Sequence, residues 1–124
     1  MAHLATLTIL FVLALGLADA SISSVKLQSG DSFLIREGEH AKALVRSLTA
    51  GSQRMEFSGR NRGKWVDQNG KTVDSSRFHL YRNGSVLIRS ARPSDSGTYQ
   101  KDPNPMIRIG DMGYAPPVLI IQVV

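Results

Sequence analysis

The stretch that decides the fold is Ser85–Lys101, "SVLIRSARPSDSGTYQK". In its first half Val86 and Ile88 lie two residues apart, the spacing that marks one buried face of a strand. In its second half Gly97 tolerates a close or left-handed turn. Tyr99 follows, and a tyrosine in this position can pack its ring on the core and donate its hydroxyl to a backbone carbonyl. The stretch therefore predicts two strands of a β-domain, joined by a tight connection.

Further short runs of the same kind fill the rest of the chain. They read "SFLIR", "HAKALVR", "RMEF", "KWVD", "RFHLY" and "PPVLIIQVV". The Asn-Gly pairs at 69–70 and 83–84 stand between such runs, and Asn-Gly is a strong hairpin signal. About seven to nine short strands with frequent turns predict an all-β sandwich. A chain of 124 residues with 42% apolar content is long enough for one such domain.

The order of these motifs resembles that of an immunoglobulin domain. "SVLIRSARPSDSGTY" is similar to the passage from strand E to strand F, which ends in D-x-G-x-Y. "REGEHAKALV" is similar to the entry into strand B, and this places Ala41, Ala43 and Val45 on the inward face. "SRFHL" resembles the opening of strand D in variable and intermediate-type domains, where an arginine pairs with the aspartate of D-x-G-x-Y. The resemblance thus implies an immunoglobulin-like antiparallel β-sandwich over residues 21–124, with an Arg77–Asp95 pair.

The chain departs from that family at the two cysteine positions. On this alignment Val45 stands at the first and Lys101 at the second, and the sequence contains no cysteine. A bridge across a loop of that length would restrict the unfolded chain by roughly 4 kcal/mol. The domain must therefore hold together without an inter-sheet disulfide, and thiol catalysis or cysteine-ligated metals are excluded.

Lys101 poses a packing problem in the predicted strand F. On a regular strand it shares a face with Tyr99, and an unpaired lysine in the core costs several kcal/mol. Pro103 follows closely and removes a ladder donor. We therefore expect the strand to end or twist outward near Gln100, so that Lys101 reaches solvent.

The identity of the core aromatic on strand C is open between two residues. The family spacing from Val45 leads to Phe57, which we favour, with Trp65 on the next strand. If Trp65 is the core residue instead, "SGRNRG" becomes part of a long loop between strands B and C.

Basic side chains are densest around "GRNRGKW". Arg60, Arg62 and Lys64 stand beside Trp65, with Arg54 nearby. Such a loop suits a sulfated glycan, an acidic protein or a lipid headgroup, and it also suits a solvated hairpin tip that has no partner. Nucleic acid is not expected because the segment lacks interleaved aromatic residues for base stacking.

Two other surface features stand out. Asn83-Gly84-Ser85 is an N-x-S sequon on a predicted hairpin tip, so Asn83 is a candidate glycosylation site. The segment "KDPNPMIRIGDMGYAPP" joins the last two strands, at the place where antibody domains keep a binding loop. Met106 and Tyr114 within it are candidate contact residues.

The first twenty residues predict a secretory signal peptide. An apolar run from Leu4 to Leu17 is followed by Ala18-Asp19-Ala20, a small-x-small cleavage pattern, which makes Ser21 the mature start. A signal anchor is the competing interpretation because the charged region before the apolar run is thin. The run is shorter than the ~20 residues of a spanning helix, and no later segment has membrane-spanning character. Without residues 1–20 the chain has 15 basic and 9 acidic side chains, a net charge of +6.

Catalytic patterns are missing from the mature sequence. Its two histidines, His40 and His79, lie on separate predicted strands with no carboxylate or serine at a motif spacing. No cofactor or metal is expected. The sequence therefore predicts a non-catalytic secreted recognition module that binds an extracellular protein. The alternative is a basic protein that associates with matrix or sulfated glycan through Arg54, Arg60, Arg62 and Lys64.

Overall fold

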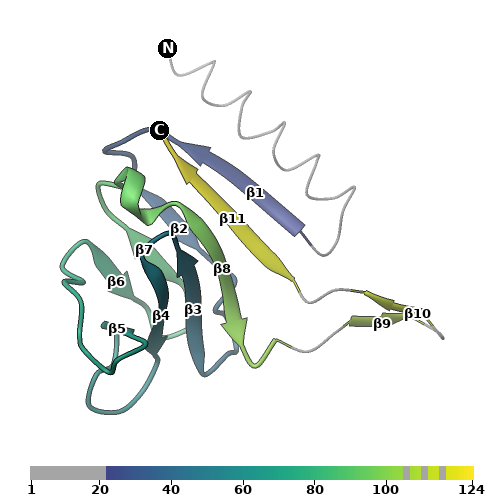
Figure 1. The fold of residues 1–124 in the computed structure, drawn as a ribbon. Helices are drawn as coiled ribbons and strands as arrows, with labels where there is room; N and C mark the ends of the chain where they lie inside the picture. The colour runs from purple at the N-terminus through teal and green to yellow at the C-terminus, as the bar shows by residue number, and fades with distance from the viewer. Residues whose placement is uncertain (1–21, 105–106, 110–111, 115–116) are drawn as a thin grey trace.

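The computed structural model describes residues 22–104, 107–109, 112–114 and 117–124, so the expected leader lies outside its scope. These residues form short strands and one 3-10 turn, η1 (Pro93–Asp95) (Figure 1). The strands are β1 (Ile22–Leu27), β2 (Phe33–Ile35), β3 (Ala43–Leu48), β4 (Gly51–Glu56), β5 (Trp65–Asp67), β6 (Phe78–Leu80), β7 (Val86–Ile88), β8 (Gly97–Asp102), β9 (Ile107–Ile109), β10 (Met112–Tyr114) and β11 (Val118–Val123).

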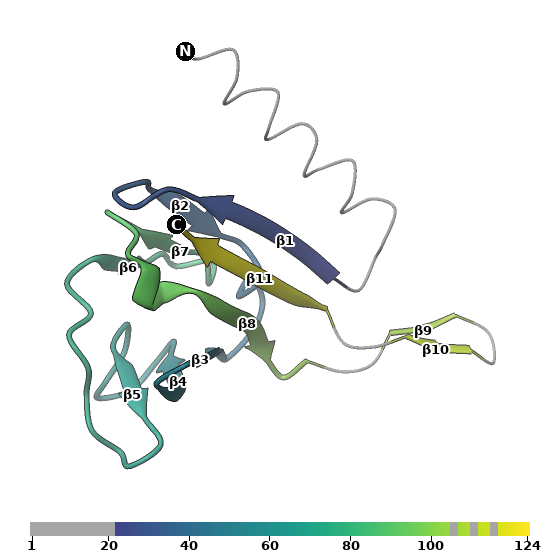
Figure 2. The same ribbon diagram turned by 45° about the horizontal axis from the view of Figure 1, so that its top comes forward.

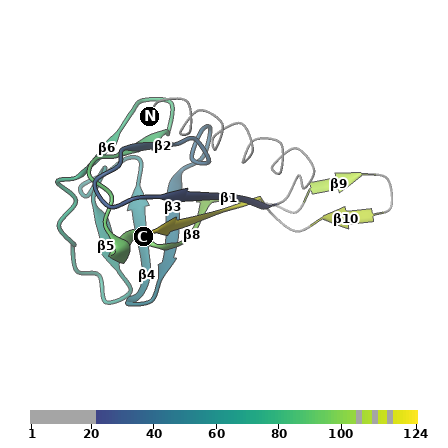
Figure 3. The same cartoon turned by 90° about the horizontal axis from the view of Figure 1, so that it is seen from above.

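Two sheets form the body of the domain. The larger has the order β1-β11-β8-β3-β4-β5, and the smaller has the order β2-β7-β6. The β1 strand runs parallel to β11, whereas the other pairs are antiparallel. The remaining strands, β9 and β10, pair with each other in a hairpin between β8 and β11. This hairpin projects beyond the body of the domain in Figures 1 and 2, and the view from above in Figure 3 agrees.

Both Asn-Gly turns form as the sequence predicts. Gly70 and Gly84 have φ angles of 83° and 92°, a left-handed conformation that glycine adopts without strain. The turn at Gly84 joins β6 to β7, and the turn at Gly70 returns the chain to an antiparallel bridge between Val66 and Thr72. The two sheets confirm the predicted all-β sandwich. The two Asn-Gly turns form connections within it.

The core lies between the two sheets, and its central aromatic is Trp65. This side chain is fully buried and meets Phe78 edge-on at 5.6 Å and Tyr99 at 6.2 Å between ring centroids. Phe57 is only partly buried and packs against the margin of the same cluster. The expectation that favoured Phe57 is therefore wrong. Other fully buried side chains come from both sheets and include Ile35, Leu44, Met55, Val86, Ile88 and Ile121.

The segment assigned to strand B lies elsewhere in the fold. Residues 43–48 form β3, which pairs with β8 in the same sheet, and Val45 stands opposite Gln100. Val45 therefore does not occupy the first cysteine position, across the sandwich from β8. The strand of the smaller sheet that precedes β3 is β2, where Ile35 is fully buried.

Strand β8 is longer than expected. It continues through Lys101, which pairs with Leu44, and ends at Asp102, immediately before Pro103. The proline thus sets the end of the strand, but two residues later than the predicted end near Gln100. Lys101 is half-buried rather than fully exposed.

Strand β1 and the β9–β10 hairpin were not predicted. The β1 sequence, "ISSVKL", has two serines in its first half and little apolar periodicity, so its strand conformation depends on pairing with β11. No helix within the described ranges is long and apolar enough to span a bilayer.

Candidate functional site

The connection from η1 to β8 is tied by contacts to Asp95. Arg77 on the entry to β6 donates Nη1 to Asp95 Oδ2 at 2.7 Å and Nη2 to Oδ1 at 3.0 Å. The backbone N–H of Arg92 donates to Oδ2 at 2.9 Å, and the Tyr99 hydroxyl donates to the Asp95 carbonyl at 2.6 Å. The predicted Arg77–Asp95 pair and the role of Tyr99 are both confirmed.

Gly97 lies between these residues where the chain has no room for a side chain. A Cβ atom at this position would stand 2.2 Å from the backbone oxygen of Ser47 on β3. The start of β8 therefore packs directly on the backbone of β3, as the expected structural role of Gly97 implies.

A second arginine, which sequence reasoning missed, completes this cluster. Arg46 on β3 is only 4% exposed, and its guanidinium carbon lies 4.2 Å from the centroid of the Trp65 ring. Nη1 contacts Asp95 Oδ1 at 3.3 Å and donates to the Tyr99 hydroxyl at 3.2 Å. Nε and Nη2 both donate to Gln53 Oε1, at 2.9 and 2.7 Å. The guanidinium of Arg46 is thus held by an ion pair with Asp95 and by hydrogen bonds to Gln53 and Tyr99.

Charge balance keeps Asp95 ionised in this cluster. Burial alone would raise the pKa of Asp95, but the hydrogen bonds from Arg77 and from the Arg92 N–H lower it below its usual value. Burial raises the pKa of Tyr99, so its hydroxyl stays protonated and remains a donor. The side chains of Arg46 and Asp95 are 4% and 2% exposed, and we assign the cluster a structural role.

The outer face of the larger sheet bears a neutralised charge cluster. Arg54 on β4 contacts the carboxylates of Glu56 on its own strand and of Asp102 at the end of β8, and these contacts raise the pKa of Arg54. The three side chains are each between 41% and 45% exposed. Arg54 therefore does not add free positive charge to the basic loop, contrary to the expectation from the sequence.

The loop between β4 and β5 presents the other predicted cations. Arg60, Arg62 and Lys64 are exposed, and none has a carboxylate within 4.0 Å among the described residues. Trp65, the residue that follows Lys64, is fully buried. The prediction that Trp65 contributes to a binding surface is therefore wrong, while the three cations stand where a ligand can reach them.

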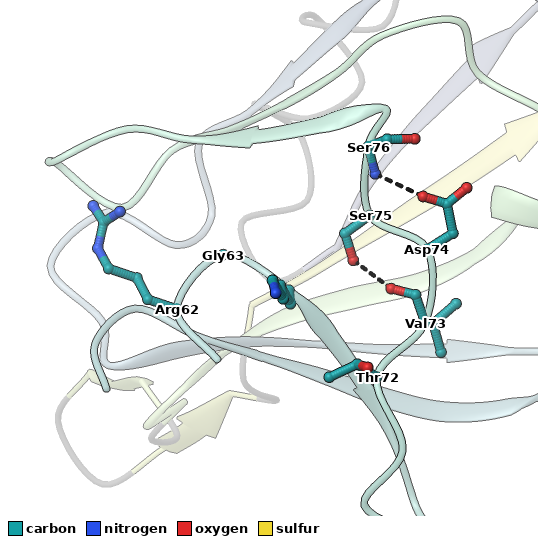
Figure 4. Close-up of a pocket in the computed structure, with 8 residues that line it drawn as sticks. Arg62, Gly63, Thr72, Val73, Asp74, Ser75 and Ser76 are labelled. Carbon is teal, nitrogen blue, oxygen red and sulfur yellow. Dashed lines mark hydrogen bonds between the residues drawn. The ribbon is translucent and has the colours of Figure 1, made fainter. Parts of the chain in front are cut away.

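A pocket of about 500 Å³ lies between this loop and the segment 72–76 (Figure 4). Ser75 Oγ accepts the backbone N–H of Trp65 at 2.8 Å and donates to the Val73 carbonyl at 2.9 Å. The hydroxyl is therefore engaged in hydrogen bonds within the domain. Asp74 also lines the pocket, but its carboxylate accepts the Ser76 N–H at 3.1 Å, and the side chain of Arg62 extends away from the 72–76 segment. This mixture of charges suits a neutral polar group better than an anion.

The β9–β10 hairpin carries the remaining candidates. Tyr114 pairs with Ile107, Met112 pairs with Ile109, and Arg108 and Gly113 occupy the register between them. Met106 lies outside the described residues. Asn83 is exposed on the β6–β7 turn, where the sequence placed it.

The strand order, the buried tyrosine and the Arg77–Asp95 pair together decide the fold. It is an immunoglobulin-like β-sandwich. Two further strands, β4 and β5, extend the larger sheet beyond β3, an arrangement found in domains of the variable type. The immunoglobulin-like fold thus forms here without the inter-sheet disulfide, because the chain contains no cysteine.

No family model matches the chain, and no curated protein is significantly similar in sequence. Three solved structures are similar to it in fold. The extracellular domain of the voltage-gated sodium channel beta4 subunit is 16% identical, with 84% of this chain and 86% of that chain covered and a TM-score of 0.45. The CD2-binding domain of CD58 is 11% identical, with 83% and 53% covered and a TM-score of 0.41. The V domain of amphioxus IgVJ-C2 is 18% identical, with 80% and 98% covered and a TM-score of 0.37.

The side chains that could bind a metal are dispersed over the described part of the chain. Within the described ranges no three His, Cys, Asp or Glu residues gather closely enough to hold a metal ion. His79 is exposed and stacks edge-on against Tyr81 at 4.6 Å between ring centroids. His40 is exposed in the loop between β2 and β3. The basic loop and the β9–β10 hairpin are the two surfaces that carry the predicted binding residues.

Proposed function

We propose that the chain is a secreted, non-catalytic recognition module that binds an extracellular protein through the β9–β10 hairpin. The observation that carries this proposal is the projection of the hairpin beyond both sheets (Figure 2). An isolated two-stranded hairpin is marginally stable in water, so a projecting one gains from a partner that covers it.

The hairpin sequence supports an apolar contact. Two of the three residue pairs in the hairpin are apolar: Ile107 pairs with Tyr114, and Ile109 pairs with Met112. Large apolar and aromatic residues, above all Tyr and Met, are enriched at the centres of protein interfaces. A projecting segment with this composition is typical of an interaction site rather than of a solvated connection.

Binding of the tagged mature protein to an array of extracellular proteins and to whole cells tests the proposal. We expect binding to persist at ~0.3 M NaCl, where exposed charge pairs are largely screened. Changing both Ile109 and Tyr114 to Glu should abolish it. The matched control changes Arg60, Arg62 and Lys64 to Ser, and it should bind like the wild type. Salt-resistant binding that survives the hairpin changes would contradict the proposal.

The alternative function is binding to sulfated glycan through the β4–β5 loop. Three exposed cations without a carboxylate partner among the described residues favour it. It predicts the reverse pattern: retention on heparin that is lost by ~0.3 M NaCl and in the variant with serines at 60, 62 and 64. The carboxylate of Asp74 beside this loop makes it the second candidate.

A further inference from the structure

A second hollow, of about 590 Å³, lies beside the β6–β7 turn. Its lining includes the aromatic ring of Phe57, the cations of Lys42 and Arg82, and Asn83 itself. This volume is within the about 300–1,000 Å³ of small-ligand pockets, which typically combine an apolar floor with a few polar groups. The hollow therefore has room and chemistry for one sugar residue, next to the acceptor asparagine of a sequon.

The conformation of the turn leaves the Asn83 amide nitrogen available. Asn83 Oδ1 accepts the Ser85 N–H at 3.0 Å and the Ser85 hydroxyl at 2.6 Å. Its Nδ2 has no hydrogen-bond partner among the described residues, and the side chain is exposed. The carbonyl end of the amide is thus fixed by the turn, while the nitrogen faces solvent at the rim of the hollow.

Close backbone packing fixes Asn83 relative to Phe57. A Cβ on Gly84 would stand 2.2 Å from the backbone oxygen of Gly38, and a Cβ on Gly38 would stand 2.8 Å from Cζ of Phe57. The turn, the loop before β3 and the Phe57 ring are therefore in direct contact. A group attached to Asn83 begins at a set position beside that ring.

We propose that Asn83 carries an N-linked glycan whose first N-acetylglucosamine lies in this hollow against Phe57. The proposal rests on the secretion part of the proposed function, because the modification occurs in the secretory pathway. In the reaction Asn83 Nδ2 loses a proton and bonds to C1 of the sugar. The bond from C1 to the diphosphate of a lipid-linked oligosaccharide donor breaks, and the lipid diphosphate leaves.

The sugar ring and the hollow are chemically matched. The face of the ring that carries axial C–H groups stacks on an aromatic side chain, as apolar contacts at ligand sites do. Lys42 and Arg82 are exposed donors on the rim and can reach the acetamide oxygen and ring hydroxyls. The glycan would then cover the partly exposed Phe57 and act as part of the packing of the β6–β7 end.

Attachment is tested by expressing the full chain in secreting animal cells and measuring the intact mass of the protein in the medium. We expect one glycan, removed by peptide N-glycosidase, and none in Asn83→Gln. Asn69→Gln is the matched control, because Asn69 also stands in an Asn-Gly turn but is followed by Gly70 and Lys71 and forms no sequon. Secreted wild-type protein without a glycan overturns the proposal and leaves secretion intact.

Failure to reach the medium would count against secretion, and a known secretory leader in front of Met1 then delivers the same chain for the mass measurement. The position of the sugar is tested on protein trimmed to a single N-acetylglucosamine. We expect a nuclear Overhauser contact between the acetamide methyl and the Phe57 ring. We also expect a Tm about 2–5 °C above that of the sugar-free protein, which Phe57→Leu abolishes. A glycan without either effect overturns the placement.

Discussion

Arg46 organises the part of the core around Trp65 and Tyr99. It is buried at 4% exposure, where an unpaired charge would be costly, and it is held by Asp95, Gln53 and the Tyr99 hydroxyl. Its guanidinium also lies over the Trp65 ring, a favourable cation–π position. One side chain thus joins β3 to β4, β8 and the core tryptophan.

Removing the shared carboxylate should be the most damaging change in this cluster. Asp95→Ala leaves the guanidiniums of Arg46 and Arg77 without their common partner, and breaking a buried pair in this way costs about 3–5 kcal/mol. Arg46→Met should cost less, because Asp95 keeps its pair with Arg77. Urea unfolding measures both. The exposed neighbour Asp74→Ala is the control, with an expected change within about 0.5 kcal/mol.

The acid range should reveal two carboxyls with opposite effects. The pKa of Asp95 is lowered in the folded state. Its contribution to the free energy of unfolding is therefore complete above the usual pKa near 3.9, and it is lost as the pH falls through the lower folded value. Burial raises the pKa of Glu37, so the folded state favours its protonated form. Ionised Glu37 therefore costs stability at neutral pH, and that cost is relieved as the pH falls through its raised folded pKa towards about 4.3.

Glu37→Gln should accordingly be more stable than the wild type at pH 7 and should show a flatter stability profile in the acid range above about pH 4.3. Asp95→Asn should instead flatten the profile below about pH 4. Urea midpoints across the pH range measure both slopes. A Glu37→Gln variant with an unchanged slope would show that the carboxyl is solvated in the folded protein.

At the scale of elements, turn chemistry and local motifs were readable, but the register of β3 was not. The resemblance of "REGEHAKALV" to the entry into strand B implied that Ala41, Ala43 and Val45 face inward. In the structure Ala43 is buried, but Leu44 and Arg46 are the residues that face the core. A slip of one residue moves every side chain of a strand to the other face. The inward arginine hid the true register, because its partners Gln53 and Asp95 come from other parts of the chain.

Gly97 sets the distance between β8 and β3. Gly97→Ala would place Cβ 2.2 Å from the Ser47 carbonyl oxygen, so the backbone must shift. We expect overpacking and strain to lower the free energy of unfolding by about 2–5 kcal/mol. Gly30→Ala is the matched control. It also has a positive φ, of 96°, but its Cβ meets no atom within 4 Å. It should lose only about 1–2 kcal/mol of backbone strain. Equal thermal midpoints for the two variants would refute the close packing of β8 on β3.

At the scale of the whole molecule, the two sheets are joined without a covalent bridge. The buried cluster between the sheets and the contacts of Asp95 to residues of both sheets perform that task. The fold class could be predicted because D-x-G-x-Y and the Asn-Gly turns act locally. Strand β1 and the Arg46 contacts could not, because both depend on pairing between segments that are distant in sequence.

Cleavage after Ala20 stays a prediction, and it is compatible with an intact strand β1 (Ile22–Leu27). Strand β1 starts at Ile22, so a mature chain that begins at Ser21 retains the whole strand. N-terminal sequencing of protein from culture medium should return Ser21 as the first residue. Protein recovered from membranes with Met1 still attached would favour the signal anchor instead.

The parallel pairing of β1 with β11 has a consequence for the order of events during synthesis. β11 lies between β1 and β8 in the sheet, yet among the described strands it leaves the ribosome after all the others. Until then β1 has no neighbour, and β8 offers an open edge to other nascent chains, which is a known route to aggregation. We therefore expect the larger sheet to assemble late, with rates in the slow range of non-local β-topologies, and to depend on chaperones that shield the β8 edge in the meantime.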